Sequence, residues 1–204
     1  MEEPLMDAST WNERYATAEY VWKVDPNVFL VDQTADLAPG RALDLACGEG
    51  RNAVWLAEQG WAVTGVDFAE AGLDKGRRLA AQRGIEVDWI CADATSWAGA
   101  GPDFDLVAIF YLQLPGDDRR RAVGHAGRAL APGGTLLVVA HDAANLTDGV
   151  GGPRDATVLS TPADVLADLE AAGVDVEVVQ AETVERPVQG SERPALDCLV
   201  RVQR

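Results

Sequence analysis

Residues 42–52 are Ala42-Leu43-Asp44-Leu45-Ala46-Cys47-Gly48-Glu49-Gly50-Arg51-Asn52, and this stretch decides the fold. A short apolar run carries one acid near its end and is followed by two glycines, after which residues 53–57 have the apolar composition of a helix. Gly48 and Gly50 lack a Cβ, which would restrict the turn and hold a ligand away from the main chain. The stretch therefore predicts a strand, a tight turn and a helix around a nucleotide site.

The spacing of the glycines fits two classes of nucleotide. Gly48, Gly50 and Ala53 satisfy the pattern G-x-G-x-x-G/A of dinucleotide-binding proteins. Asp44 precedes these glycines, near the end of the predicted strand. A carboxylate at that position attracts a cationic amino group and repels a pyrophosphate. The glycines alone leave both classes open, and Asp44 favours a ligand without phosphate.

Two further acids follow the next predicted strands. Asp67 follows residues 62–66 and stands about twenty residues after the glycines, where an acid accepts hydrogen bonds from ribose hydroxyls. Asp93 follows residues 87–92, where a carboxylate oxygen can accept from the exocyclic amine of an adenine. Acids at three successive strand ends fit an amino-acid nucleoside.

The motif Asp44-Leu45-Ala46-Cys47-Gly48-Glu49-Gly50 resembles the glycine motif of the class I S-adenosylmethionine-dependent methyltransferases. Ala46 is the one departure, because glycine is commoner at that position. The resemblance implies that S-adenosylmethionine is the cofactor and that the motif holds its methionine part. The other cofactor-binding residues that it implies are Asp67 for the ribose, Asp93 with Ala94 for the adenine, and Phe68, Phe110, Trp11 and Arg14.

The composition narrows the partners. A chain of 204 residues that is 48% hydrophobic fits one domain with a sizeable core. Its formal charge of −16 opposes binding to DNA, RNA or an anionic membrane. No apolar run approaches the ~20 residues that cross a bilayer, and the first residues lack the pattern of a signal peptide. We therefore expect a cytoplasmic protein that binds a small molecule.

The cysteines and histidines predict no metal site. The three cysteines form no C-x-x-C pair, and neither they nor the two histidines have the spacing of metal ligands. We expect reduced thiols, with Cys91 and Cys198 buried as small apolar side chains.

Apolar strands alternate with predicted helices through the middle of the chain, which indicates an α/β domain with a mostly parallel sheet. A turn is predicted at residues 132–134 before a strand at 135–140, and residues 174–183 and 196–202 are predicted to form an antiparallel pair. The resemblance implies a Rossmann-like, doubly wound domain over residues 39–204, with seven strands in the order 3-2-1-4-5-7-6 and strand 7 antiparallel.

The segment before this domain is rich in aromatic residues. The run Trp11-Asn12-Glu13-Arg14-Tyr15 resembles that of the small tellurite-resistance-type and thiopurine-type methyltransferases. The resemblance implies that residues 1–38 form a helical cap over the active edge of the sheet, with Arg14 reaching the carboxylate of the methionine part. A helix that packs its aromatic face on the core, with Arg14 in solvent, explains the same residues.

Tyr111 and His141 follow the fourth and fifth predicted strands and are the candidate catalytic residues. His141 has the chemistry of a general base or of a group that orients the acceptor, and it is also explained as a polar residue leaving the sheet. Phe110 and Tyr111 could line the methyl group or belong to the core. Residues 142–157 are predicted to be a long loop, either a lid or a surface loop without regular structure.

The sequence thus predicts a methyltransferase that acts on a small-molecule acceptor, whether a thiol, a chalcogen, a phenol or an amine. One alternative is a nicotinamide-dependent oxidoreductase that binds NAD(P), which Asp44 and the absence of a Tyr-x-x-x-Lys pair at Tyr111 weaken. Another is a non-catalytic sensor that binds S-adenosylmethionine. The oligomeric state is not predicted.

Overall fold

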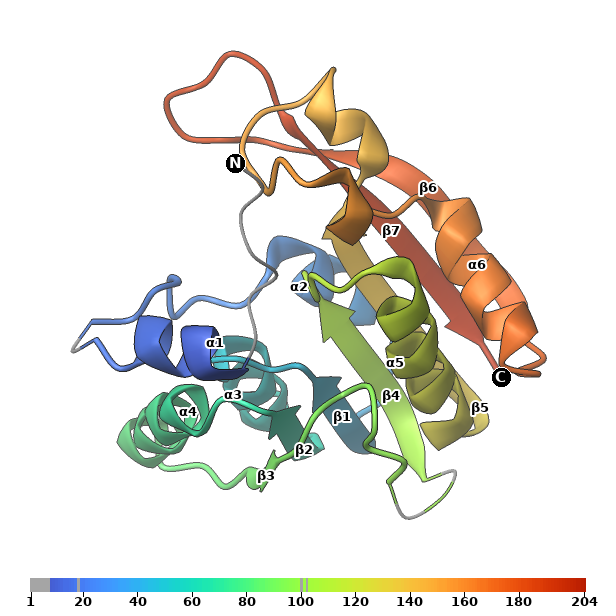
Figure 1. Cartoon of the computed structure of the whole chain (residues 1–204). Helices are drawn as coiled ribbons and strands as arrows, with labels where there is room; N and C mark the ends of the chain where they lie inside the picture. Colours follow the sequence, from blue (N-terminus) through green and yellow to red (C-terminus); the bar gives the residue numbers. More distant parts are fainter. Residues whose placement is uncertain (1–7, 18, 100, 102) are drawn as a thin grey trace.

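The computed structural model describes residues 8–17, 19–99, 101 and 103–204. These residues form a seven-stranded sheet in the order β3-β2-β1-β4-β5-β7-β6, in which β7 runs antiparallel to both of its neighbours (Figure 1). The strands are β1 Arg41–Leu45, β2 Ala62–Asp67, β3 Asp88–Cys91, β4 Phe104–Phe110, β5 Leu130–His141, β6 Glu177–Arg186 and β7 Ala195–Gln203. The predicted fold class, strand order and direction of strand 7 are confirmed.

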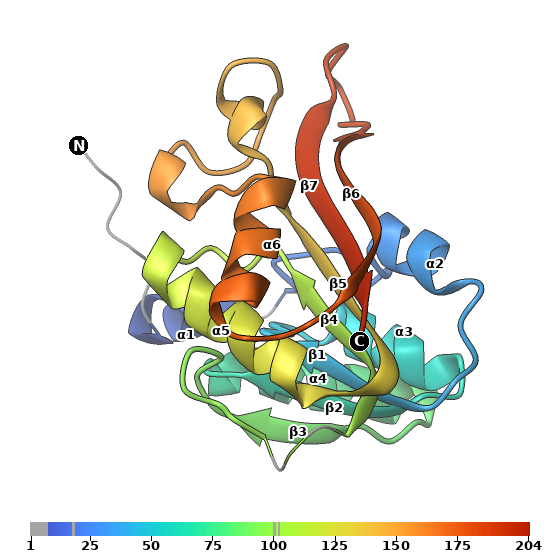
Figure 2. The ribbon, with the colours of Figure 1, turned by 90° about the vertical axis from the view of Figure 1, so that its right-hand side faces the viewer.

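Helices cover both faces of the sheet (Figure 2). They are α1 Ala8–Tyr15, α2 Val28–Thr34, α3 Arg51–Glu58, α4 Glu70–Arg83, α5 Gly116–Ala129 and α6 Pro162–Ala171. The helices α5 and α6 pack on one face, and α2 and α3 pack on the other, with α4 beside α3. None of the helices in the described residues has both the length and the apolar character that crossing a membrane requires.

The alternation of side chains along each strand divides the core into two layers. Leu43 and Leu45 of β1 contribute to the core under α5 and α6, whereas Ala42 contributes to the core under α2 and α3. Side chains of successive strand residues point to opposite faces, so Asp44 shares the face of Ala42. Its carboxylate accepts a hydrogen bond from the backbone N–H of Ala53 in α3. The pattern of the strand therefore sends this one acid toward the glycine turn.

Two strands differ from their predicted bounds by three residues or more. Instead of a turn followed by a strand at 135–140, β5 begins at Leu130, which is fully buried and pairs with Phe104. The next pair joins Leu106 to Thr135, so the predicted turn residues form an irregularity within the strand. The strand predicted at 174–183 instead runs over 177–186. Val174 lies before the strand and packs into the core under α5 and α6.

Cys91 and Cys198 differ in burial because they lie in different strands of the sheet. Cys198 lies in β7 between two strands and is fully buried, as predicted. The prediction that Cys91 is buried is wrong, because β3 is an edge strand and this side chain is exposed.

Candidate functional site

A cavity of about 800 Å³ lies at the carboxyl ends of β1, β2, β4 and β5 and is closed on one side by Trp11, Tyr15, Tyr20 and residues 22–28. Parallel strands joined by right-handed crossovers bring their carboxyl ends to one edge, where α/β sheets bind ligands. The predicted site residues that line the cavity are Trp11, Asp44, Ala46, Cys47, Gly48, Asp67, Phe68, Phe110, Tyr111 and His141. The predicted residues that do not line it are Arg14, Gly50, Asp93 and Ala94.

Asp44 is the most unusual acid of the cavity. Its side chain is buried, and its Oδ2 has no hydrogen-bond partner among the described residues. Burial raises the pKa of this carboxyl to about 7, and the hydrogen bond from the N–H of Ala53 only partly opposes that effect. An unpaired buried carboxylate is costly unless a cation reaches it. The arrangement therefore favours a cationic group of a ligand beside Asp44.

Asp67 holds the glycine turn in shape. Its Oδ2 accepts a hydrogen bond of 2.8 Å from the N–H of Gly48, and its Oδ1 accepts one of 2.8 Å from the N–H of Ala69. Burial raises the pKa of this carboxyl, and the backbone hydrogen bonds act in the opposite direction. Each oxygen keeps a second lone pair that a ligand hydroxyl can use.

Two residues without the freedom of glycine adopt left-handed backbone conformations at this edge. Ala46 has φ of 63° and Tyr111 has φ of 54°. For an ordinary L-residue this conformation costs roughly 1–2 kcal/mol. The value at Ala46 gives a physical reason why glycine is commoner at this position of the motif, and the values at both residues mark strain at the strand ends that face the cavity.

A buried ion pair that the sequence did not suggest ties the N-terminal segment to the glycine turn. Nζ of Lys75 lies 2.7 Å from Oε1 of Glu49, and the two side chains are only 2% and 3% exposed. Glu49 also accepts hydrogen bonds of 3.0 Å from the N–H groups of Val21 and Trp22, and Lys75 donates one of 2.5 Å to the carbonyl of Glu19. Lys75 lies on the buried face of α4 beside apolar residues. A lysine at such a position in the sequence indicates a buried charge that needs a partner.

The aromatic residues of the N-terminal segment close the same side of the cavity. Tyr15 is buried, and a Cβ at Gly48 would come within 2.9 Å of its hydroxyl oxygen. The guanidinium of Arg14 lies 5.1 Å and 5.2 Å from the ring centroids of Trp11 and Trp22. Arg14 is exposed and does not line the cavity, whereas both of these indole rings do.

Asp93 and Ala94 lie beyond the cavity wall. Asp93 is exposed, and its Oδ1 accepts a hydrogen bond of 2.7 Å from the N–H of Thr95. Ala94 is buried in the core under α5. Sγ of Cys91, two residues before Asp93, contacts the carbonyl of Phe68 at 3.5 Å, and Phe68 lines the cavity.

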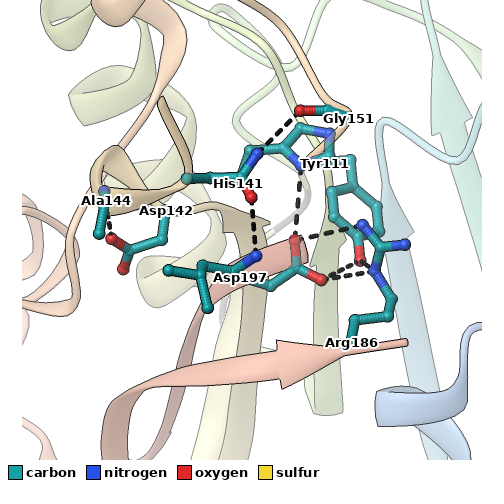
Figure 3. A network of polar contacts seen from close by, with 9 residues as sticks. Tyr111, His141, Asp142, Ala144, Gly151, Arg186 and Asp197 are labelled. Carbon is teal, nitrogen blue, oxygen red and sulfur yellow. Dashed lines mark hydrogen bonds and ion pairs between the residues drawn. The ribbon is translucent and has the colours of Figure 1, made fainter. Parts of the chain in front are cut away.

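The other end of the cavity contains a polar network around Asp197 (Figure 3). Asp197 is fully buried near the start of β7, and its Oδ2 accepts from Tyr111 at 2.8 Å and from Nε of Arg186 at 2.6 Å. Its Oδ1 lies 3.4 Å from Nδ1 of His141. The rings of His141 and Tyr111 lie 4.7 Å apart. Tyr111, His141 and Arg186 line the cavity.

Burial and the charges of this network shift the pKa values of Asp197 and Tyr111. Burial pushes the pKa of Asp197 upward, but its contacts with His141 and Arg186 outweigh burial and leave the pKa lowered. Burial, with the charge of Asp197, raises the pKa of Tyr111 to about 12. The sequence predicted Tyr111 and His141 but missed Asp197 and Arg186. Asp197 is an acid within a largely apolar strand, and this position was the one feature of the sequence that could have indicated a role for it.

Residues 142–157 contain more structure than predicted. They include short 3₁₀ helices at Ala143–Leu146 and Ala156–Val158. Asn145 is buried and bonds the carbonyl of Gly151 and the N–H of Leu196, which ties the segment to β7. In the residues that the structure describes, no group of three or more His, Cys, Asp or Glu side chains could hold a metal ion.

Comparison with known proteins identifies related sequences over the centre of the chain. Residues 42–134 match the family model described as Methyltransferase domain. Over 111 residues the chain is 41% identical to Demethylmenaquinone methyltransferase of Thermus thermophilus, in an alignment that covers 53% of this chain and 50% of that protein. The chain spans about half the length of the curated relatives it matches.

Solved structures are similar over almost the whole chain. The N-methyltransferase NodS from Bradyrhizobium japonicum WM9, solved with S-adenosyl-L-homocysteine, gives a TM-score of 0.73 at 18% identity and covers 97% of this chain and 98% of that one. TehB from Haemophilus influenzae gives a TM-score of 0.68 at 18% identity and covers 97% of this chain and 66% of that one. At these identities the similarity shows the fold.

Proposed function

We propose that this chain, which carries a methyltransferase domain of the class I S-adenosylmethionine-dependent family, transfers a methyl group from S-adenosylmethionine to a small-molecule acceptor. The sulfonium supplies an electrophilic methyl group, so the protein mainly has to position the two reactants. A cavity of about 800 Å³ lies in the upper part of the size range of small-molecule sites, which is compatible with a cofactor and a small acceptor side by side.

The unpaired Oδ2 of Asp44 carries this proposal. The ammonium of the methionine part is a cation that would satisfy the buried oxygen. A dinucleotide would bring a pyrophosphate to the same place and add to the cost of the buried carboxylate. Asp44 therefore supports the sulfonium cofactor over NAD(P).

The remaining contacts follow the order of the strands. We propose that the glycine turn from Asp44 to Gly50 holds the methionine part and that Asp67 holds the ribose. Asp93 and Ala94 are proposed neighbours of the adenine, because they follow β3, whose Cys91 contacts the cavity residue Phe68. The segment before residue 39 is proposed as a cap, supported by Trp11 and Tyr15 in the cavity wall.

The acceptor is proposed to bind at the end formed by Phe110, Tyr111 and His141. A small molecule fits this end because its walls combine aromatic rings with the polar groups of Tyr111 and His141. The name of the Thermus thermophilus relative refers to demethylmenaquinone, which supports an aromatic acceptor.

Isothermal calorimetry tests the cofactor. We expect S-adenosylhomocysteine to bind the chain and NAD to give no heat at the same concentration. Asp44→Ala should remove the binding of S-adenosylhomocysteine. A stronger response to NAD would support an oxidoreductase instead. Tight binding with no turnover across thiols, phenols and amines would support a sensor.

A further inference from the structure

We propose that Asp197 is a positioning residue that holds His141 as a general base, and that the acceptor is a hydroxyl compound, a phenol or an enol, that enters with its proton. The inference rests on the proposed methyl transfer. It adds a class of acceptor and a role for a residue of β7.

The carboxylate of Asp197 is fixed on one side. Its Oδ2 already accepts from the hydroxyl of Tyr111 at 2.8 Å and from Nε of Arg186 at 2.6 Å. Both partners come from other elements, since Tyr111 follows β4 and Arg186 ends β6. The side chain is fully buried, so rotation would leave a charged group without partners. The other oxygen, Oδ1, lies 3.4 Å from Nδ1 of His141 and also accepts a longer hydrogen bond of 3.5 Å from Nη2 of Arg186.

Nδ1 of His141 faces this oxygen. The two atoms lie 3.4 Å apart, and Nδ1 is buried and makes no hydrogen bond within the usual limits among the described residues. Gly152 packs against the imidazole ring of His141, because a Cβ at this glycine would lie 3.0 Å from Nδ1. A small movement of the ring would complete the hydrogen bond to Asp197. Catalytic hydrogen bonds are often long before the substrate is bound.

The arrangement sets the tautomer of the imidazole. When Nδ1 carries the proton and donates to Oδ1 of Asp197, Nε2 keeps its lone pair for the cavity that His141 lines. Asp142, the next residue, does not compete, because its carboxylate accepts from Ala144 and Thr183. Asp197, to which Tyr111 and Arg186 donate hydrogen bonds, is therefore the acid that faces Nδ1 of His141.

The chemistry needs a base only if the acceptor is protonated. As the acceptor oxygen attacks the methyl carbon, the carbon–sulfur bond breaks and leaves its electron pair on sulfur. The acceptor proton passes to Nε2 of His141. The imidazolium that forms lies beside the carboxylate of Asp197, which stabilises it. A thiolate enters without its proton, and a neutral amine attacks through its lone pair before it loses one. Neither needs a base for the attack itself, so the pair favours a hydroxyl acceptor.

Nitrogen NMR tests the tautomer without any acceptor. The chain has two histidines, so ¹⁵N-histidine labelling with a His125→Gln variant assigns the signals of His141. We expect neutral His141 to carry its proton on Nδ1, and Asp197→Asn to move the population toward the Nε2–H form that a free histidine side chain favours. Asp168→Asn is the matched control, since it removes another buried acid paired with an arginine and should leave the tautomer unchanged. A wild-type His141 with its proton on Nε2 overturns the inference, whether or not Asp197→Asn folds.

Turnover of phenols with different acidity tests the role of the base. For 4-methylphenol, Asp197→Asn and His141→Ala should each lower kcat by about 100-fold. For 4-nitrophenol, which is already ionised at pH 8, the loss should be less than about 5-fold, because no proton has to be removed. Equal losses for both phenols, or methylation of thiophenol with no phenol accepted, would overturn the inference while leaving methyl transfer in place. Failure to bind S-adenosylhomocysteine would instead overturn the proposed function.

Discussion

Nζ of Lys75 and Oε1 of Glu49 lie 2.7 Å apart in a part of the molecule that water barely reaches. Glu49 belongs to the glycine turn and Lys75 to α4, and the backbone of residues 19–22 completes their hydrogen bonds. The pair therefore joins three segments that are distant in the chain. It connects the wall of the cavity to the loop proposed to hold the cofactor.

Removal of Lys75 should destabilise the chain. Lys75→Met would leave the carboxylate of Glu49 buried without its cation, and breaking such a pair costs about 3–5 kcal/mol. Urea unfolding monitored by tryptophan fluorescence measures the change. Trypsin should also cleave the N-terminal segment faster in the variant, because residues 19–22 lose their anchor.

The double variant Lys75→Met with Glu49→Gln is the control. It removes both charges and should recover about half or more of the lost stability, because no unpaired charge remains. If Lys75→Met unfolds at the wild-type urea concentration, the pair does not hold the segment.

Binding of S-adenosylhomocysteine should release a proton below pH 7. The pKa of Asp44 is raised to about 7 in the free protein, so the carboxyl is largely protonated at pH 6. A bound ammonium favours the carboxylate and lowers that pKa, which expels the proton. Calorimetry at pH 6 in buffers of different ionisation enthalpy measures the released protons. Asp44→Asn should release none, and a wild type that also releases none would argue against an ammonium at Asp44.

The same carboxyl should weaken the ligand-free fold as pH rises. Its pKa is about 7 in the folded chain and 3.8 as an ordinary aspartate, so between these values the folded state binds more protons than the unfolded state. The free energy of unfolding therefore falls as pH rises from about 4 to about 7. Asp44→Asn should remove on the order of 2 kcal/mol of that fall, measured by urea unfolding at pH 5 and pH 8. Parallel pH profiles in the two proteins would show that Asp44 is not strained by burial.

Ala46→Gly should stabilise the chain by about 1 kcal/mol. The backbone at this position has φ of 63°, which glycine adopts without the penalty of a Cβ, although its freer unfolded chain offsets part of the gain. Thermal unfolding measures the difference. Ala108→Gly is the control, because Ala108 is a buried residue of β4 without positive φ and should lose about 1 kcal/mol instead. Destabilisation of both variants alike would mean that the turn tolerates alanine without strain.

Asp67→Ala should weaken the binding of S-adenosylhomocysteine by about 1–3 kcal/mol. The variant loses the proposed contact with the ribose and also the hydrogen bonds that fix Gly48 and Ala69. Calorimetry against Asp74→Ala, an exposed acid on α4, separates this effect from a general loss of charge. Equal affinities of the two variants would contradict the proposed contact between Asp67 and the ribose.

The part of the site that is local in sequence could be predicted. Gly48 and Asp44 belong to one strand and turn, and their chemistry depends on residues a few positions apart. The alternation of Leu43, Asp44 and Leu45 was enough to send the acid to the opposite face from its neighbours. Arg14 shows where such reasoning stops, because its guanidinium stacks on Trp22, a partner that spacing does not identify.

The sequence by itself determined the order of elements and the glycine turn with Asp44, because hydrophobic periodicity and glycine spacing are properties of neighbouring residues. Only the tertiary structure decided the polar network around Asp197. Asp197 and His141 become partners because β7 runs antiparallel beside β5, in a register that pairs these two residues. Lys75 and Glu49 meet because α4 packs beside α3 near the glycine turn. Such contacts depend on how strands and helices align across the core, which the pattern along any one segment does not specify.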